Sequence, residues 1–139
     1  MTQELSARDV EFVAFHLAQK HLAFDESIPD FESRYPNILE SCLAVPFQRF
    51  YGQFAYPTLV GKASILFYLL IKNHPFQNGK KRIAITAVSV LLLKNDKWLA
   101  MDLDLLYRFT VWVARSRPED KDFILAAIHR VLQTHLRSA

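Results

Sequence analysis

Residues 59–95 read LVGKASILFYLLIKNHPFQNGKKRIAITAVSVLLLKN, which is two apolar runs joined by a short polar loop. The first run is apolar almost all round a helical wheel, so we expect a helix over residues 57–73. The second run is equally apolar, and we expect a helix over residues 81–95. Helices that are apolar on every side are buried, so this pair predicts the centre of the core.

Further helices are predicted on both sides of this pair. Apolar residues recur at helical spacing and the chain has only three glycines, which favours an all-α fold of about six helices. We expect the other helices over residues 7–21, 36–45, 103–115 and 119–136. Ser6 and Asp9 have the spacing of a capping box at the start of the first. Residues 47–56 alternate apolar and polar side chains around Gly52, which predicts a short β-hairpin.

The composition indicates a single globular domain over residues 1–139. The chain has a formal charge of +3, and 51% of its residues are hydrophobic. The lone Cys42 excludes an internal disulfide and a cysteine-rich metal site, and we expect it to be a buried small apolar side chain. We expect Trp98 and Trp112 in the core. No apolar run reaches the roughly 20 residues that a membrane helix needs, so we expect a cytoplasmic protein without a membrane anchor.

The loop at residues 74–82 concentrates the polar chemistry of the chain. Pro75 excludes His74 from helical geometry, and Gly79 allows a tight turn with close approach to a ligand. Three cations then fall on the first turn of the next helix, where they oppose the helix dipole and where a bound phosphate would offset that cost. The loop is not a Walker A motif, because its first glycine and its hydroxyl residue are absent.

Each of these features also has an ordinary structural interpretation. A histidine before a proline is often a helix C-cap, three basic residues are often a solvated face, and Asn-Gly is a common turn. Their combination in one loop between two buried helices is what favours a functional site.

The loop reads, in order, His74, Pro75, Phe76, Gln77, Asn78, Gly79, Lys80, Lys81, Arg82. It resembles the signature of the Fic/Doc family, which is histidine, any residue, phenylalanine, any residue, an acid, Gly or Ala, Asn, Gly or Lys, and Arg. The Lys81–Arg82 ending resembles the Doc (death-on-curing) branch. The resemblance covers most of the chain and implies a compact helical bundle with a hairpin flap.

The resemblance also implies roles for individual residues. His74 would be the general base that takes a proton from a target hydroxyl, and Phe76 would anchor the loop in the core. The residues implied to bind nucleotide phosphate are Asn78, Gly79, Lys80, Lys81 and Arg82. The flap residues implied to dock a strand of the target protein are Phe50, Tyr51, Gly52 and Gln53.

Two positions depart from the signature. Asn78 stands where the family has the acid that holds Mg²⁺, and a neutral amide is a weaker ligand for a hard cation. Lys80 stands where the family has asparagine, and it could supply part of the positive charge that the metal brings. The resemblance therefore implies ATP or a related nucleotide, with Mg²⁺ held only weakly at Asn78. No self-inhibitory helix motif is found, so the expected inhibitor is a separate antitoxin.

Three functional hypotheses follow. The first is transfer of an AMP or phosphoryl group from a nucleotide to a hydroxyl of a protein substrate, by the toxin of a toxin–antitoxin pair. The second is a catalytically weak member of the fold that binds nucleotide or a protein partner without transfer. The third is a nucleic-acid binder using residues 80–82 with Arg130 and Arg137, which ranks last because no recognised nucleic-acid motif is present.

Overall fold

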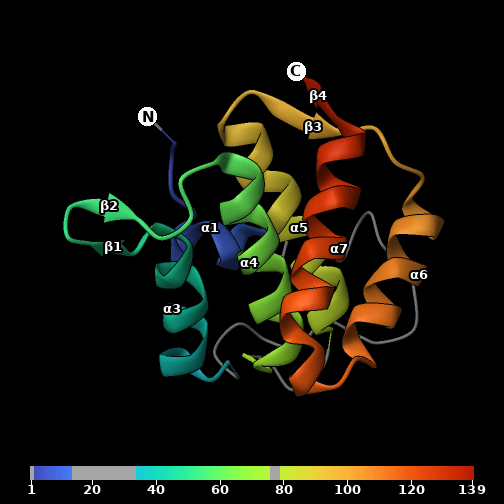
Figure 1. Ribbon diagram of the computed structural model, residues 1–139, viewed down its shortest axis with the longest axis horizontal. Coiled ribbons are helices and arrows are strands. Elements are labelled where there is room, and N and C mark those ends of the chain that lie inside the picture. Colours follow the sequence, from blue (N-terminus) through green and yellow to red (C-terminus); the bar gives the residue numbers. More distant parts are fainter. Residues whose placement is uncertain (1, 14–33, 76–78) are drawn as a thin grey trace.

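The computed structural model describes residues 2–13, 34–75 and 79–139, and these residues form a helical fold (Figure 1). The α-helices are α1 (Ala7–Phe12), α3 (Pro36–Ala44), α4 (Leu59–Lys72), α5 (Lys80–Lys94), α6 (Leu103–Ala114) and α7 (Lys121–His135). In the described ranges, two 3₁₀ turns, η3 (Val45–Phe47) and η4 (Pro118–Asp120), precede the first hairpin and α7. The strand pairs of this part of the chain are β1 (Arg49–Phe50) with β2 (Gln53–Phe54), and β3 (Lys97–Leu99) with β4 (Leu136–Ser138). The predicted helical architecture with a short hairpin is confirmed.

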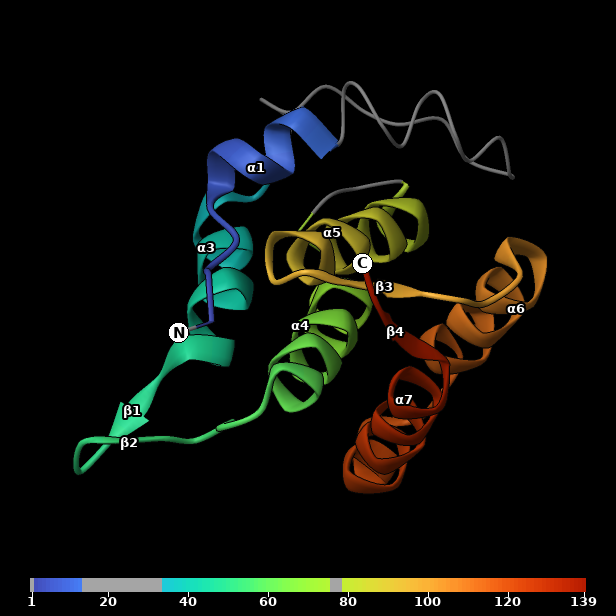
Figure 2. The same ribbon diagram turned by 90° about the horizontal axis from the view of Figure 1, so that it is seen from above.

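Helix α4 is the centre of the fold. It packs against α3, α5, α6 and α7, and Figure 2 shows it lying between α3 on one side and α7 on the other. Every residue from Lys62 to Ile71 is buried, which confirms that a helix apolar on all sides occupies the core. Thr58 caps its start by accepting a hydrogen bond from the Gly61 N–H at 2.9 Å.

Helix α5 is the second buried helix, as predicted. Its side chains from Arg82 to Val88 are buried, together with Leu91 and Leu92. It begins at Lys80, one residue earlier than expected, and ends at Lys94. Because α4 and α5 pack directly on each other, both ends of the loop between them are fixed to the core.

The start of α1 is held by the predicted capping box. The Asp9 N–H donates to the Ser6 hydroxyl at 3.1 Å, and the Ser6 N–H donates to the Asp9 carboxylate at 2.9 Å. The described part of the first predicted helix is Ala7–Phe12, and the remainder of the predicted range 7–21 lies outside the described residues.

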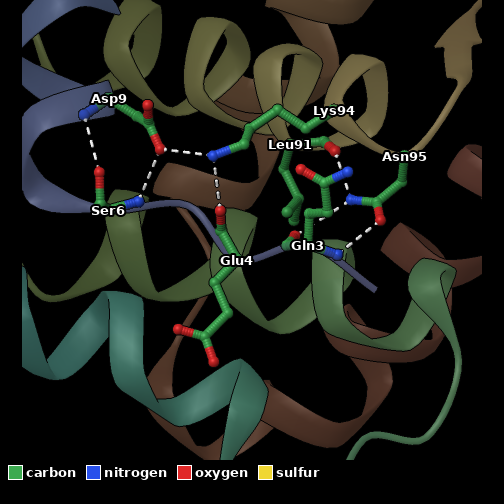
Figure 3. Close-up of polar contacts among 7 residues, drawn as sticks. All are labelled: Gln3, Glu4, Ser6, Asp9, Leu91, Lys94 and Asn95. Carbon is green, nitrogen blue, oxygen red and sulfur yellow. Dashed lines mark hydrogen bonds and ion pairs between the residues drawn. The ribbon is translucent and has the colours of Figure 1, made fainter. Parts of the chain in front are cut away.

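The segment before α1 is fastened to the end of α5 (Figure 3). Lys94 forms an ion pair with Asp9 at 2.8 Å and also donates to the carbonyl of Glu4 at 2.8 Å. The Gln3 N–H donates to the Asn95 side-chain oxygen at 2.7 Å, and the Asn95 amide donates back to the Gln3 carbonyl at 3.1 Å. These contacts join two segments that are about ninety residues apart.

The β3–β4 pair was not predicted. It is antiparallel, with Trp98 opposite Arg137 and Leu99 opposite Leu136, so the last helix ends at His135 and the chain continues as a strand. The expectation that Trp98 lies in the core is wrong, since it is 46% exposed on the outer side of β3. Trp112 is likewise 44% exposed, because it lies on the outer face of α6 and stacks on Phe109 with ring centroids 5.6 Å apart.

Cys42 is fully buried in α3, as predicted, and its thiol contacts the carbonyl of Leu69 at 3.5 Å. Burial raises the pKa of this thiol to about 11. A thiol with so high a pKa stays protonated near neutral pH, so Cys42 acts as a packing residue.

Candidate active site

His74 lies at the end of α4 in a left-handed backbone conformation. The helix ends at Lys72, Asn73 caps it by donating to the Leu69 carbonyl at 2.9 Å, and His74 then has φ 52°. The following Pro75 is buried, and its carbonyl accepts a hydrogen bond from the Tyr35 N–H at 2.8 Å. The prediction that the proline holds His74 out of the helix is confirmed. A histidine with a left-handed backbone costs roughly 1 kcal/mol of stability. The buried residues on both sides of the loop offset this cost.

The His74 imidazole is surrounded by positive charge. The Lys80 ammonium lies 2.7 Å from Nδ1 of His74. Partial burial of the ring, the charge of Lys80 and the charge of Lys72 together lower the pKa of His74 below its ordinary value of 6.5. The ring is therefore neutral near pH 7, which is the state a general base requires.

Lys72 also connects the site to the rest of the bundle. Its ammonium donates to the carbonyls of Ala114 at 3.1 Å and Ser116 at 2.6 Å, at the end of α6. A cation at a helix C-terminus is favourable because the last carbonyls carry partial negative charge. These hydrogen bonds hold the side chain of Lys72, two residues before His74, at the end of α6.

Gly79 marks the start of α5. It is buried, has φ 74°, and its carbonyl accepts the hydrogen bond of the Ile83 N–H at 3.0 Å. A side chain at this left-handed position would be strained, which explains the glycine that follows Asn78. The prediction that Gly79 takes a conformation suited to glycine and that a helix begins directly after it is confirmed.

The three cations of the loop occupy the first turn of α5, as predicted. Lys80 and Lys81 are partly buried, whereas Arg82 is buried with 7% of its surface exposed. The Thr86 hydroxyl donates to the Arg82 carbonyl at 2.7 Å. The first turn of α5 therefore carries three cations and the free N–H groups of a helix start, and Lys80 joins this turn to His74. Such a turn is suited to a phosphate chain.

Phe76, Gln77 and Asn78 lie outside the described residues, so the anchor and metal-ligand roles expected for Phe76 and Asn78 stay predictions. Within the described ranges, no group of three or more His, Cys, Asp or Glu side chains could hold a metal ion. Among the described residues of the loop, Lys80, Lys81 and Arg82 are cations, and none carries the carboxylate oxygens that Mg²⁺ prefers.

The predicted flap is a hairpin. Phe50 pairs with Gln53 and Arg49 with Phe54, and a two-residue turn joins the strands with φ 54° at Tyr51 and φ 78° at Gly52. Positive φ at both turn positions is the mark of the type I′ turn that suits β-hairpins. The hairpin projects from the helical body in both views, and Phe50 and Tyr51 are 59% and 105% exposed (Figures 1 and 2).

Lys62 fixes the base of this hairpin, and sequence reasoning missed it. It is 1% exposed, its ammonium donates to the Tyr56 carbonyl, and it lies 4.1 Å from the Phe54 ring centroid. The guanidinium of Arg49 covers the same Phe54 ring at 4.3 Å. The available signal was a lysine in the apolar interior of the helix, since a buried cation needs a specific partner.

The flap and the His74 loop lie toward opposite ends of α4 (Figure 1). Lys62 and Lys72 are ten residues apart, which corresponds to about 15 Å of helix rise. Near the loop end, Asn73 joins Asn37, Ile38 and Ser41 in lining a surface hollow.

Comparison with known proteins agrees with this geometry. Residues 4–92 match the model of the Fic/DOC family, a region that contains the flap, α4, the loop and most of α5. The chain belongs to the Fic/Doc family. It is also 34% identical over 104 residues to a protein named Toxin Doc from Mycolicibacterium smegmatis (strain ATCC 700084 / mc(2)155), covering 75% of this chain and 73% of that protein. No solved structure matches.

Among the described residues, no helix is long and apolar enough to cross a membrane.

Proposed function

We propose that this Fic/Doc protein transfers an AMP or phosphoryl group from ATP or a related nucleotide to a hydroxyl of a target protein. We propose further that it acts as a toxin controlled by a separate antitoxin. Family membership and the similarity to Toxin Doc support both proposals. The observation that carries the first is the loop, where a neutral histidine contacts Lys80 at a helix start that also carries Lys81 and Arg82.

In this proposal His74 is the general base. The target hydroxyl gives its proton to the neutral imidazole while its oxygen forms a bond to phosphorus. The bond from phosphorus to the leaving group breaks, and the leaving group is pyrophosphate for AMP transfer or ADP for phosphoryl transfer. Such reactions depend on positioning and charge neutralisation more than on covalent chemistry by the protein.

The start of α5 holds the nucleotide in this proposal. The N–H groups after Gly79 and the side chains of Lys80, Lys81 and Arg82 bind phosphate oxygens. Arg82 is the strongest of these, because its planar guanidinium can bind two oxygens at once from a buried position. Since the expected metal ligand, Asn78, lies outside the described residues, no step is assigned to a metal.

The flap docks the target in this proposal. Phe50, Tyr51, Gly52 and Gln53 present an exposed apolar turn beside a strand edge to which an extended segment can add. An extended chain advances about 3.3 Å per residue. A target segment would therefore need roughly five extended residues to cover the distance along α4 between the flap end and His74.

Labelled ATP tests the transfer directly. The protein is incubated with cell lysate and ATP labelled at either the α- or the γ-phosphate. A protein band labelled from the α-phosphate indicates AMP transfer, and a band labelled from the γ-phosphate alone indicates phosphoryl transfer. ATP binding without any labelled band would support the catalytically weak alternative and overturn the proposal of transfer.

A further inference from the structure

The contact between Lys80 and His74 determines which nitrogen of the imidazole carries the proton. An ammonium group has donors and no acceptor, so His74 Nδ1, 2.7 Å from the Lys80 ammonium, must hold the lone pair. In the neutral ring the hydrogen is then on Nε2. A neutral imidazole has one lone pair, so in this structure the atom that could accept a proton is already occupied.

We propose that Lys80 couples nucleotide binding to the availability of the His74 base. This inference rests on the proposed transfer reaction. Without nucleotide, Lys80 donates to Nδ1 and occupies the base. When a phosphate chain binds at the start of α5, the Lys80 ammonium turns to a phosphate oxygen and leaves Nδ1 open to the target hydroxyl. Lys80 is in this sense a positioning residue, which acts through His74.

The position of Lys80 in the fold allows this exchange. It is the first residue of α5, directly after Gly79, so its side chain starts at the helix end where a phosphate would bind. Its stem has four flexible carbons, and its contact with His74 is at the surface. Neither partner has to leave the core for the hydrogen bond to be exchanged.

The energetics favour phosphate over imidazole as the partner of the ammonium. A hydrogen bond from the ammonium to an anionic phosphate oxygen adds the attraction between opposite charges, which a bond to an uncharged acceptor lacks. The imidazole is a neutral acceptor, and the charges of Lys72 and Lys80 already disfavour its protonated form. Nucleotide binding would therefore withdraw Lys80 from Nδ1, place positive charge on the phosphates, and leave a neutral base beside them.

The chemistry is specific to this chain within the signature that it resembles. The corresponding position there is asparagine, whose amide carries no charge. If such an amide moved from the histidine to a phosphate, it would bring no positive charge to neutralise the phosphate. With lysine at this position, the side chain can leave His74 for a bound anion.

Nuclear magnetic resonance of ¹⁵N-labelled histidine tests this exchange without requiring transfer activity. The Nδ1 signal of His74 is recorded in wild type, in Lys80→Met and in the matched control Lys81→Met, each with and without ATP. Lys80→Gln provides a second variant in case Lys80→Met alters folding. The exposed His129 on α7 serves as an internal reference.

We expect the ATP-free Nδ1 signal to differ between wild type and Lys80→Met, and to coincide between wild type and Lys81→Met. Adding ATP should move the wild-type signal toward the Lys80→Met position. Coinciding signals of wild type and both Lys80 variants without ATP would overturn the inference. So would a wild-type signal that stays in place while calorimetry shows ATP bound, and in that case the proposed transfer would still stand. Absence of ATP binding to wild type would refute the proposed function itself, and the exchange with it.

Discussion

Replacing Lys62 with methionine should loosen the flap while leaving the nucleotide site intact. Methionine keeps the length of the stem but removes the ammonium that contacts the Tyr56 carbonyl and the rings of Phe54 and Phe47, at 4.1 and 5.6 Å. Because Lys62 is 1% exposed, water cannot replace these contacts. The carbonyl of Tyr56 would lose the hydrogen bond that it receives from the lysine.

The size of the effect follows from these contacts. Losing a hydrogen bond from a charged donor costs about 1.5–3 kcal/mol. Losing a desolvated cation–π contact costs about 1–2 kcal/mol. The substitution also removes a buried charge that Arg49 repels, and this recovers part of the lost stability. We expect a net loss of about 2 kcal/mol in the free energy of unfolding, which lowers the melting temperature by about 6–8 °C.

The assay combines thermal unfolding with the two functional measurements. Lys62→Met should lower modification of the protein target and leave ATP affinity unchanged, because the flap lies at the other end of α4 from the loop. Lys121→Met is the matched control, since Lys121 is an exposed lysine 5.8 Å from the ring centroid of Tyr68. It should change stability by less than about 0.5 kcal/mol. Wild-type stability and wild-type target modification in Lys62→Met would refute this account of the flap.

The stability difference should also depend on pH. Burial, and then the charge of Arg49, lower the pKa of Lys62 below its ordinary value of 10.5. Between the lowered pKa and 10.5 the unfolded chain binds more protons than the folded one, so the stability contributed by Lys62 rises with pH. The difference between wild type and Lys62→Met should therefore grow as pH increases toward 10.5 in chemical denaturation. A difference that shrinks over this range would contradict the lowered pKa of Lys62.

Three further predictions concern the nucleotide, the metal and the target. Arg82→Ala should weaken ATP binding by roughly 2 kcal/mol or more, since a buried guanidinium would lose its phosphate contacts; unchanged affinity in calorimetry would exclude that role. Asn78→Asp should raise Mg²⁺ affinity in the presence of ATP and increase the transfer rate, because a carboxylate is the better ligand; a wild type that already requires ordinary Mg²⁺ and does not respond to the change would contradict this. The double change Phe50→Ser and Tyr51→Ser should reduce labelling of the protein target at unchanged ATP affinity, and a parallel loss of both would assign the flap a purely structural role.

The central architecture could be predicted because its signals are local. Residues 59–72 and 80–94 form helices that are apolar almost all round, so burial is the stable arrangement for both. Pro75 and Gly79 determine where the first helix ends and the second begins. The hairpin was predictable for the same reason, since alternation and Gly52 define two strands and their turn within a few residues.

Contacts between distant segments could not be predicted in this way. Strand β3 pairs with β4 across almost forty residues, and each strand has only three, which is too short for a periodic pattern. Residue type alone predicts Trp98 and Trp112 in the core, but they are 46% and 44% exposed, because tryptophan is large and seldom fully buried. The contact of Lys80 with His74 depends on side-chain geometry, which no spacing rule encodes.

The mass of a target protein after incubation with ATP tests the central claim most directly. With wild type we expect the target to gain the mass of AMP or of a phosphoryl group. With His74→Ala we expect no gain and an unchanged melting temperature, because His74 lies at the surface of a loop whose ends are held by α4 and α5. A target that gains the same mass at the same rate with His74→Ala would contradict the assignment of the base and, with it, the proposed mechanism.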